Sequence, residues 1–139
     1  MSRQAEHHSD YHFEYSFKVR DYEIDAEGIV NNANYLHYLE LTRHEFCEQE
    51  GIPFGKMQSL GIVPVLSRAE IDYLNPLRSG DTVVSKLRLE RQGPKFVFHQ
   101  DIFNQTGTSI IRARITVVTI ENGRLSRGDS LARFFSKYI

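Results

Sequence analysis

The chain has no tryptophan, a single cysteine and no long apolar run. The one cysteine, Cys47, cannot form an internal disulfide bond, which favours a reducing compartment, so we expect a cytoplasmic protein. No segment approaches the roughly 20 apolar residues that a membrane-spanning helix needs. Residues 1–12, MSRQAEHHSDYH, also lack the apolar stretch of a signal peptide. Neither a membrane span nor a secretory leader is therefore expected.

The chain as a whole has almost no net charge, but its two halves carry net charges of opposite sign. The 17 Lys and Arg side chains nearly balance the 18 Asp and Glu side chains. This balance argues against a dedicated nucleic-acid-binding protein, which is usually basic. Residues 1–70 hold 6 basic and 12 acidic side chains, whereas residues 71–139 hold 11 basic and 6 acidic ones. The asymmetry predicts a local basic surface for a small anion, or complementary contacts between the halves.

The length of 139 residues fits one domain with one substantial core. Residues 1–10 are polar and show no periodicity, so we expect a flexible tail there and a single domain over residues 11–139. Alternating apolar and polar residues, bounded by turn-forming residues, predict five strands. These lie at residues 11–20, 62–74, 82–91, 95–103 and 109–120.

One long helix is predicted over residues 32–50, because apolar side chains recur there at nearly helical spacing and a glycine and a proline follow. Its apolar stripe is Tyr35, Leu36, Leu39 and Phe46. A short amphipathic helix is predicted over residues 129–138, with Asp129 as the N-cap. A sheet with one apolar face buries that face by wrapping around the apolar helix. The expected fold is α+β, with an antiparallel five-stranded sheet around one central helix and its last four strands in a meander.

Acidic residues alternate just before the long helix, at Asp21, Glu23, Asp25 and Glu27. A calcium-binding EF-hand loop would need glycine at its sixth position and glutamate at its twelfth. Counted from Asp21, these positions hold Ala26 and Asn32. The simpler interpretation is that these acids are solvated and favour the positive end of the following helix. We prefer that interpretation for all of them except Asp25.

Asp25 lies three residues before Gly28, and glycine lets the backbone approach a ligand closely. Asn31 or Asn32 can cap the helix, which would place free backbone N–H groups near the same spot. A carboxylate that faces free N–H donors is suited to acyl transfer. The donors stabilise a developing oxyanion, and the carboxylate activates water or attacks the carbonyl.

The segment YEIDAEGIVNNANYLHYLE, residues 22–40, resembles the signature of hotdog-fold thioesterases of the 4-hydroxybenzoyl-CoA thioesterase-like branch. That signature is D-x-x-G-x-V, then two polar residues, then x-x-Y leading into the central helix. Residues 69–81, AEIDYLNPLRSGD, are similar to the family's turn from a strand through Pro to Gly-Asp. The resemblance covers the chain from about Tyr15 to Tyr138.

This resemblance implies a hotdog fold and the hydrolysis of acyl-CoA or similar acyl thioesters without a metal or a bound cofactor. It implies that Asp25 is the catalytic carboxylate and that Gly28, Ile29 and Val30 form the backbone turn beside the thioester. The helix start, from Asn32 to Tyr35, would polarise the thioester carbonyl. In the family the carboxylate and the helix end can come from different subunits, so the resemblance also implies a homodimer or a homotetramer.

The chain departs from the family pattern at two positions. Many bacterial acyl-CoA members carry histidine where this chain has Asn32, and another branch carries histidine where it has Ile29. The string Val30-Asn31-Asn32 is instead similar to that second branch and to plant acyl-carrier-protein thioesterases. Two alternatives therefore stay open, an acyl-carrier-protein thioesterase and a non-catalytic module that binds acyl thioesters. A dehydratase of the same fold is disfavoured because its histidine-containing pattern is not visible.

Basic residues of the second half are candidates for binding a phosphorylated carrier. Arg91 and Lys95 flank the turn at residues 92–94, and Arg112 and Arg114 share a strand face. Such side chains can hold the phosphates of coenzyme A by charge-assisted hydrogen bonds, or attract an acidic acyl carrier protein.

Three further side chains carry no functional prediction. His37 and His44 are seven residues apart rather than four, and no third metal ligand is evident, so we interpret them as part of a polar helix face. Cys47 is interpreted as a buried helix thiol, because no motif of a nucleophile surrounds it.

Overall fold

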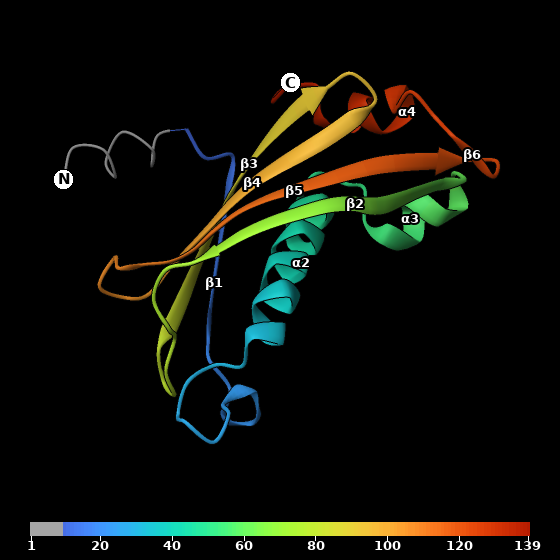
Figure 1. Cartoon of the computed structure of the whole chain (residues 1–139). Coiled ribbons are helices and arrows are strands. Elements are labelled where there is room, and N and C mark those ends of the chain that lie inside the picture. The colour runs from blue at the N-terminus through green and yellow to red at the C-terminus, as the bar shows by residue number, and fades with distance from the viewer. Residues whose placement is uncertain (1–9) are drawn as a thin grey trace.

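The computed structural model describes residues 10–139 as a curved antiparallel sheet around a long helix (Figure 1). The predicted tail, residues 1–10, lies outside the described residues except for Asp10. The strands are β1 (Phe13–Lys18), β2 (Ile62–Tyr73), β3 (Thr82–Gln92), β4 (Lys95–Phe103), β5 (Ser109–Glu121) and β6 (Arg124–Leu125). The helices are α2 (Asn32–Gln49), α3 (Phe54–Ser59) and α4 (Asp129–Ala132), with 3₁₀ turns η1 (Asp21–Glu23) and η2 (Arg133–Phe135).

The five predicted strands and the long helix are confirmed, with ends that differ by a few residues. The sequence patterns missed α3 and the short β6. The predicted helix over residues 129–138 is wrong in its extent, because α4 ends at Ala132 and gives way to a 3₁₀ turn. Its N-cap is Gly128, whose φ of 80° is left-handed, and not Asp129.

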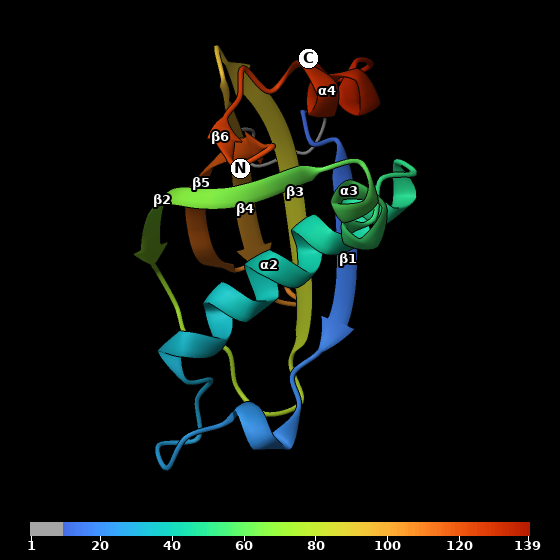
Figure 2. The same ribbon diagram turned by 90° about the vertical axis from the view of Figure 1, so that its right-hand side faces the viewer.

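The strand order is β1-β3-β4-β5-β2, with β6 paired to β5. The predicted meander therefore holds for β3, β4 and β5 but is wrong for β2, which pairs with β5 and not with β3. The connection at residues 74–81 is too long for a tight hairpin, so it carries the chain across from one sheet edge toward the other. Figure 2 shows this connection passing behind the start of α2 on its way to β3.

The core lies between α2 and the face of the sheet that curves around it (Figure 2). The alternation in β5 is as predicted, since Ala113 and Ile115 are buried there while Arg112 and Arg114 are exposed. On the helix, the expected burial of Leu36 is wrong, because its side chain is 42% exposed. Tyr35, Leu39 and Phe46 are buried as predicted, and Tyr38 and Thr42 are buried beside them.

Tyr38 and Thr42 are polar, yet they can face the core because each hydroxyl has a partner. The Thr42 hydroxyl donates to the backbone carbonyl of Tyr38 and contacts the hydroxyl of Ser85 at 2.7 Å. The Tyr38 hydroxyl donates to the carboxylate of Glu23 over 2.8 Å. Buried polar groups are tolerated when they are hydrogen-bonded in this way.

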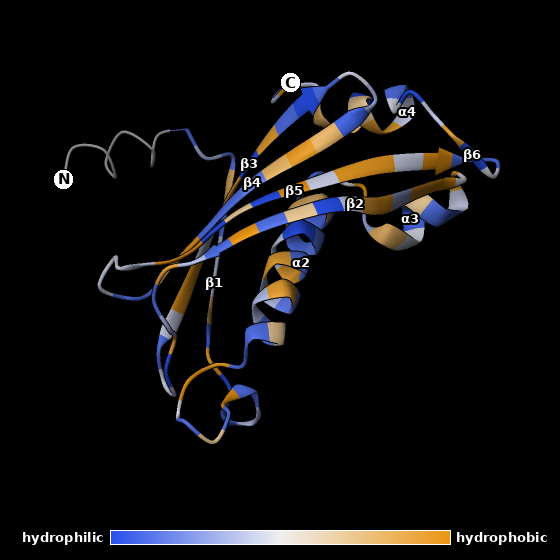
Figure 3. Ribbon diagram, in the orientation of Figure 1, coloured by the Kyte–Doolittle hydropathy of each residue, from blue (hydrophilic) through white to orange (hydrophobic). Residues whose placement is uncertain are grey.

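Strand β2 is a long edge strand whose apolar side chains are not covered by the rest of the chain. Only Ile62 is buried, while Val63, Val65, Leu66 and Tyr73 are each more than 40% exposed. Figure 3 shows the apolar residues along this strand. Exposed apolar edge strands are usually covered by a partner because their free N–H and C=O groups invite further pairing.

No helix within residues 10–139 is long and apolar enough to cross a membrane.

Candidate active site

The loop before α2 contains a tight turn that begins at Asp25 and ends at Gly28. The Gly28 N–H donates to the Asp25 carbonyl, and the Asp25 N–H donates to the Ile29 carbonyl over 2.9 Å. Gly28 has a φ of 81°, a left-handed conformation that glycine adopts without a steric penalty. This requirement explains the glycine of the predicted motif and fixes the position of Asp25 at the entrance of the turn.

Only one of the two Asp25 carboxylate oxygens accepts hydrogen bonds from its own turn. Its Oδ1 atom accepts a hydrogen bond from the Glu27 N–H at 2.8 Å and a long one from the Ile29 N–H at 3.5 Å. Within residues 10–139, no hydrogen-bond donor lies on Oδ2. The side chain is partly exposed. One oxygen is therefore oriented by the backbone, and the other is free to contact water or a substrate.

The start of α2 leaves one backbone donor free. Asn31 is the N-cap, and its side-chain oxygen accepts from the Ala33 N–H at 3.0 Å. The Asn31 N–H donates to the Glu23 carbonyl, and the Asn34 N–H donates to the Asn31 carbonyl. In the described part of the chain the Asn32 N–H alone among these first donors has no acceptor. It lies at the positive end of an 18-residue helix, where a developing negative charge is stabilised.

A pocket of about 270 Å³ opens beside this free donor. It collects four of the predicted substrate-binding residues, Ile29, Val30, Asn32 and Tyr35. Gly28 and Asp25 lie outside its lining. The rest of the wall comes from the end of β2 and the residues after it, namely Tyr73, Leu74, Asn75 and Pro76. These four were missed, although they fall within the segment 69–81 that carried the second part of the family resemblance.

Tyr35 forms the buried wall of this pocket. Its hydroxyl accepts a hydrogen bond from the Leu77 N–H at 3.0 Å, and its ring meets that of Tyr73 edge-on at 5.8 Å. Burial raises the pKa of Tyr35, and the nearby Tyr73 and Asp25 raise it further. The phenol therefore stays protonated at neutral pH. Among residues 10–139 no acceptor is found for its proton.

Comparison with known proteins identifies the family. Residues 19–134 match the sequence profile of the thioesterase-like superfamily. The chain belongs to this superfamily. The chain is 37% identical over 116 residues to the acyl-acyl carrier protein thioesterase ATL3 of Arabidopsis thaliana. This alignment covers 82% of this chain and 60% of the plant protein. It is 24% identical over 110 residues to the acyl-CoA thioester hydrolase YbgC of Escherichia coli, covering 78% and 82%.

A protein of known structure from Aquifex aeolicus is 31% identical to the chain and superposes with a TM-score of 0.81, over 87% of this chain and 96% of that one. The predicted hotdog fold and the membership of a thioesterase family are thereby confirmed. The chain spans about 60% of the length of the plant relative.

One acid of this thioesterase-family loop was interpreted wrongly from the sequence. Glu23 is not solvated, since it is 8% exposed and accepts hydrogen bonds from Tyr38 and from the backbone N–H of Arg20. The 3₁₀ turn η1 folds its side chain against α2, which the local sequence does not reveal. Asp21 and Glu27 are exposed, as expected for solvated acids.

Arg91, predicted to bind coenzyme A, is held by the C-terminal segment. Its guanidinium donates to the Asp129 carboxylate at 2.6 Å and to the Arg127 carbonyl at 2.9 Å. Lys95 is exposed at the start of β4. The binding of coenzyme A by these two residues stays a prediction.

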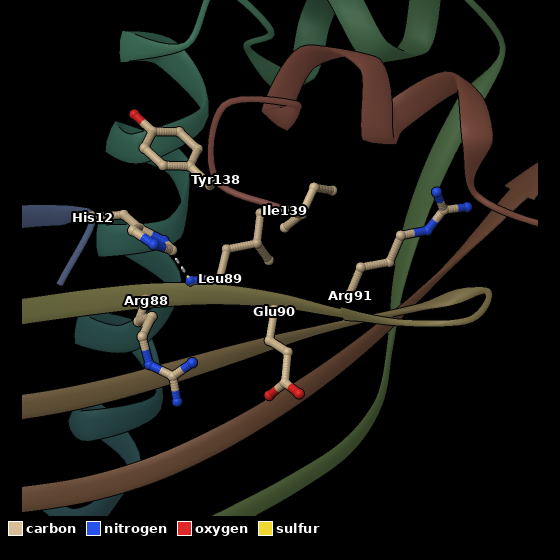
Figure 4. A pocket seen from close by; sticks show the side chains of 7 residues that line it. All are labelled: His12, Arg88, Leu89, Glu90, Arg91, Tyr138 and Ile139. Atoms are coloured by element: carbon tan, nitrogen blue, oxygen red, sulfur yellow. Dashed lines mark hydrogen bonds between the residues drawn. The ribbon is translucent and has the colours of Figure 1, made fainter. Parts of the chain in front are cut away.

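Arg91 also lines a second pocket, of about 300 Å³, between β3 and the end of the chain (Figure 4). In Figure 4, Arg88 and Glu90 point to the opposite side of β3 from His12 and Tyr138. The His12 ring accepts a hydrogen bond from the Leu89 N–H at 3.0 Å. Its charged groups do not converge on one point, and neither Asn32 nor Asp25 belongs to its lining.

The remaining candidates behave as structural residues. His37 is exposed, and the His44 ring packs on Phe54 with 3.8 Å between centroids. Cys47 is buried as predicted, and burial raises its pKa to about 12, which suppresses the nucleophilic thiolate. Within the described residues, no group of three or more His, Cys, Asp or Glu side chains is placed to hold a metal ion.

Proposed function

We propose that the protein hydrolyses acyl-CoA thioesters, with Asp25 as the catalytic carboxylate and the Asn32 N–H as the oxyanion donor. The observation that carries the proposal is a pocket lined by Ile29 and by Asn32, the residue whose N–H has no acceptor within residues 10–139. Water attacks the thioester carbonyl carbon while Asp25 takes its proton. The Asn32 N–H stabilises the resulting oxyanion, the C–S bond breaks, and the departing thiolate takes up a proton.

The site is completed by a second copy of the chain. Asp25 does not line the pocket of its own chain, so the acid and the oxyanion donor that act on one substrate come from two subunits. The exposed apolar side chains of the edge strand β2 support a homodimer, and the end of this strand also lines the pocket through Tyr73. A tetramer built from two such dimers, and a cytoplasmic location, stay predictions.

The carrier of the acyl group is coenzyme A in this proposal, with an acyl carrier protein as the second candidate. The Escherichia coli relative, named as an acyl-CoA thioester hydrolase, favours the first. The higher identity to the plant acyl-acyl carrier protein thioesterase favours the second. Basic residues after residue 71 would serve either carrier, since both are anionic. The reaction as written needs no metal or cofactor beyond coenzyme A as part of the substrate.

The test is steady-state hydrolysis of acyl-CoAs from acetyl to palmitoyl and of benzoyl-CoA, with release of the free thiol as the signal. The variant Asp25→Asn is expected to lower kcat about 100- to 10,000-fold, the usual contribution of a general base. Glu27→Gln, an exposed acid of the same turn, is the matched control and should retain wild-type activity. Full activity of a folded Asp25→Asn variant would refute the role of Asp25. Tight binding of acyl-CoA without turnover by the wild type would instead favour a non-catalytic binding module.

A further inference from the structure

Glu23 is a nearly buried acid with an unusual number of partners. Its carboxylate accepts hydrogen bonds from the Tyr38 hydroxyl and the Arg20 N–H, each at 2.8 Å, and lies 3.9 Å from the Arg20 guanidinium. Burying a carboxylate is costly unless such partners replace its water. Exposed Asp21 and Glu27 in the same loop carry no such arrangement. The burial of Glu23 therefore calls for a role that an exposed acid could not fill.

The backbone of Glu23 is tied to the start of α2 as well. Its carbonyl accepts from the Asn31 N–H and from the side-chain amide of Asn34, each at 3.1 Å. Because the Asn31 N–H is used in this way and the Asn31 side chain caps Ala33, the free donor at the helix start is the Asn32 N–H. Glu23 thus helps to decide which backbone N–H remains for the substrate.

The Asp25–Gly28 turn lies between these two anchored points of the chain. On one side of it the Glu23 side chain is bonded to Tyr38, in the second turn of α2, and on the other side the Asn31 N–H is bonded to the Glu23 carbonyl. A bridge between Ile24 and Val30 closes the base of the same loop. The hydrogen bonds of Glu23 therefore hold both the loop that carries Asp25 and the helix start that carries the Asn32 N–H. The Glu23 carboxylate is the buried group among these contacts.

We infer that Glu23 is a positioning residue for thioester hydrolysis, acting through its buried hydrogen bond to Tyr38. This inference rests on the proposed function. Glu23 touches neither the pocket nor a reacting atom. It keeps the Asp25 turn and the Asn32 N–H in the geometry that the transition state requires, and displacements of about 1 Å in such groups can cost about 100-fold in rate.

The experiment compares Glu23→Ala, Glu23→Gln and Tyr38→Phe by kcat, KM and thermal unfolding, at a temperature where every variant is folded. We expect Glu23→Ala to lower kcat about 10- to 100-fold with KM changed much less. Glu23→Gln should restore most of kcat, because an amide oxygen can accept from both Tyr38 and the Arg20 N–H. Tyr38→Phe keeps the ring packing and should lower kcat in the same direction. The double variant Glu23→Ala with Tyr38→Phe should be no slower than Glu23→Ala alone, because one interaction is removed twice.

Asp21→Ala and Glu27→Ala, exposed acids of the same loop, are the controls and should keep the wild-type kcat. A folded Glu23→Ala variant with wild-type kcat would overturn the inference, as would a loss of kcat that merely follows the unfolded fraction. If Glu23→Ala does not fold, Tyr38→Phe decides, and a wild-type kcat in that variant overturns the inference. An inactive wild type refutes the proposed function instead. An active wild type with an inactive Asp25→Asn and an unaffected Glu23→Ala refutes only the role of Glu23.

Discussion

The Tyr35 hydroxyl accepts a hydrogen bond from the Leu77 N–H at 3.0 Å, and both residues are buried. Leu77 is bonded in the other direction too, because its carbonyl accepts from the Val30 N–H at 2.9 Å. One residue of the 74–81 connection therefore contacts both the first turn of α2 and Val30, two residues after the Asp25–Gly28 turn. Val30 and Tyr35, the two residues that Leu77 holds, both line the candidate pocket.

Replacing Tyr35 by phenylalanine removes the acceptor and keeps the ring. The buried Leu77 N–H is then left without a partner, which costs about 1–3 kcal/mol. We expect the free energy of unfolding, measured by denaturant titration, to fall by about this amount, and catalytic activity to fall because the pocket wall loosens. Tyr22→Phe is the control, since Tyr22 is 81% exposed. Equal stability of the two variants would contradict the role given to the Tyr35 hydroxyl.

Gly28→Ala tests the turn that presents Asp25. The added Cβ would meet no atom within 4 Å, so only the left-handed φ of 81° opposes it. Holding alanine in that conformation costs roughly 1–2 kcal/mol. The variant should be destabilised by that amount or should relax the turn with a loss of kcat. Gly55→Ala, in α3 with equally open space and no positive φ, should instead be neutral or stabilising.

Acid should destabilise the protein partly through Glu50. Burial alone would raise the pKa of this carboxyl, but hydrogen bonds outweigh that effect and hold the pKa below its ordinary value of 4.5. The donors are Tyr138, Gln49 and Lys137. The unfolded chain therefore takes up this proton at higher pH than the folded chain. The stabilisation is complete above about pH 4.5 and is lost as the pH falls through the lower pKa of the folded state.

The measurement is the free energy of unfolding of the wild type and of Glu50→Gln between about pH 3 and pH 7. The variant should be less stable than the wild type at neutral pH, and the gap should narrow as the pH falls. Glu48→Gln changes an exposed acid in the last turn of α2, two residues before Glu50, and is expected to follow the wild-type profile. Parallel profiles for wild type and Glu50→Gln would show that Glu50 makes no such contribution.

The apolar edge of β2 can be tested by placing a charge on it. Val65 is 41% exposed, and a second copy covers it in the proposed dimer. Val65→Asp should convert the oligomer to a monomer in light scattering and should lower activity as well, because the acid and the oxyanion donor then no longer meet. Leu125→Asp alters an apolar side chain that is 65% exposed on β6 and should leave the mass unchanged. A monomeric wild type at micromolar concentration would contradict the proposed two-subunit site.

The sequence patterns were enough to predict most elements, the antiparallel sheet around the helix and the order β3-β4-β5, but not the place of β2. The alternation that buries Ala113 and exposes Arg112 depends only on strand geometry, and the pattern that predicts α2 depends only on helical spacing. The place of β2 beside β5 depends on where a long connection leads, which no local pattern encodes. The rotation of α2, which exposes Leu36 and buries Tyr38, is set by its neighbours in the sheet.

The candidate site divides in the same way. Asp25, Gly28 and Asn31 act within a few residues of one another, so spacing and capping rules could find them. The contact between Glu23 and Tyr38 joins a 3₁₀ turn to a helix face, and the wall at residues 73–76 arrives from the other half of the chain. Neither leaves a periodic signal in the sequence, because both are created by tertiary packing.

The solitary thiol of Cys47 has a practical use. It is 4% exposed and remains protonated in the native protein, so a thiol-reactive dye does not label it until the chain opens. In an assay that detects released coenzyme A by its thiol, the coloured product then counts turnovers alone. In the absence of substrate, the rate of labelling reports instead how often the helix–sheet core opens to solvent.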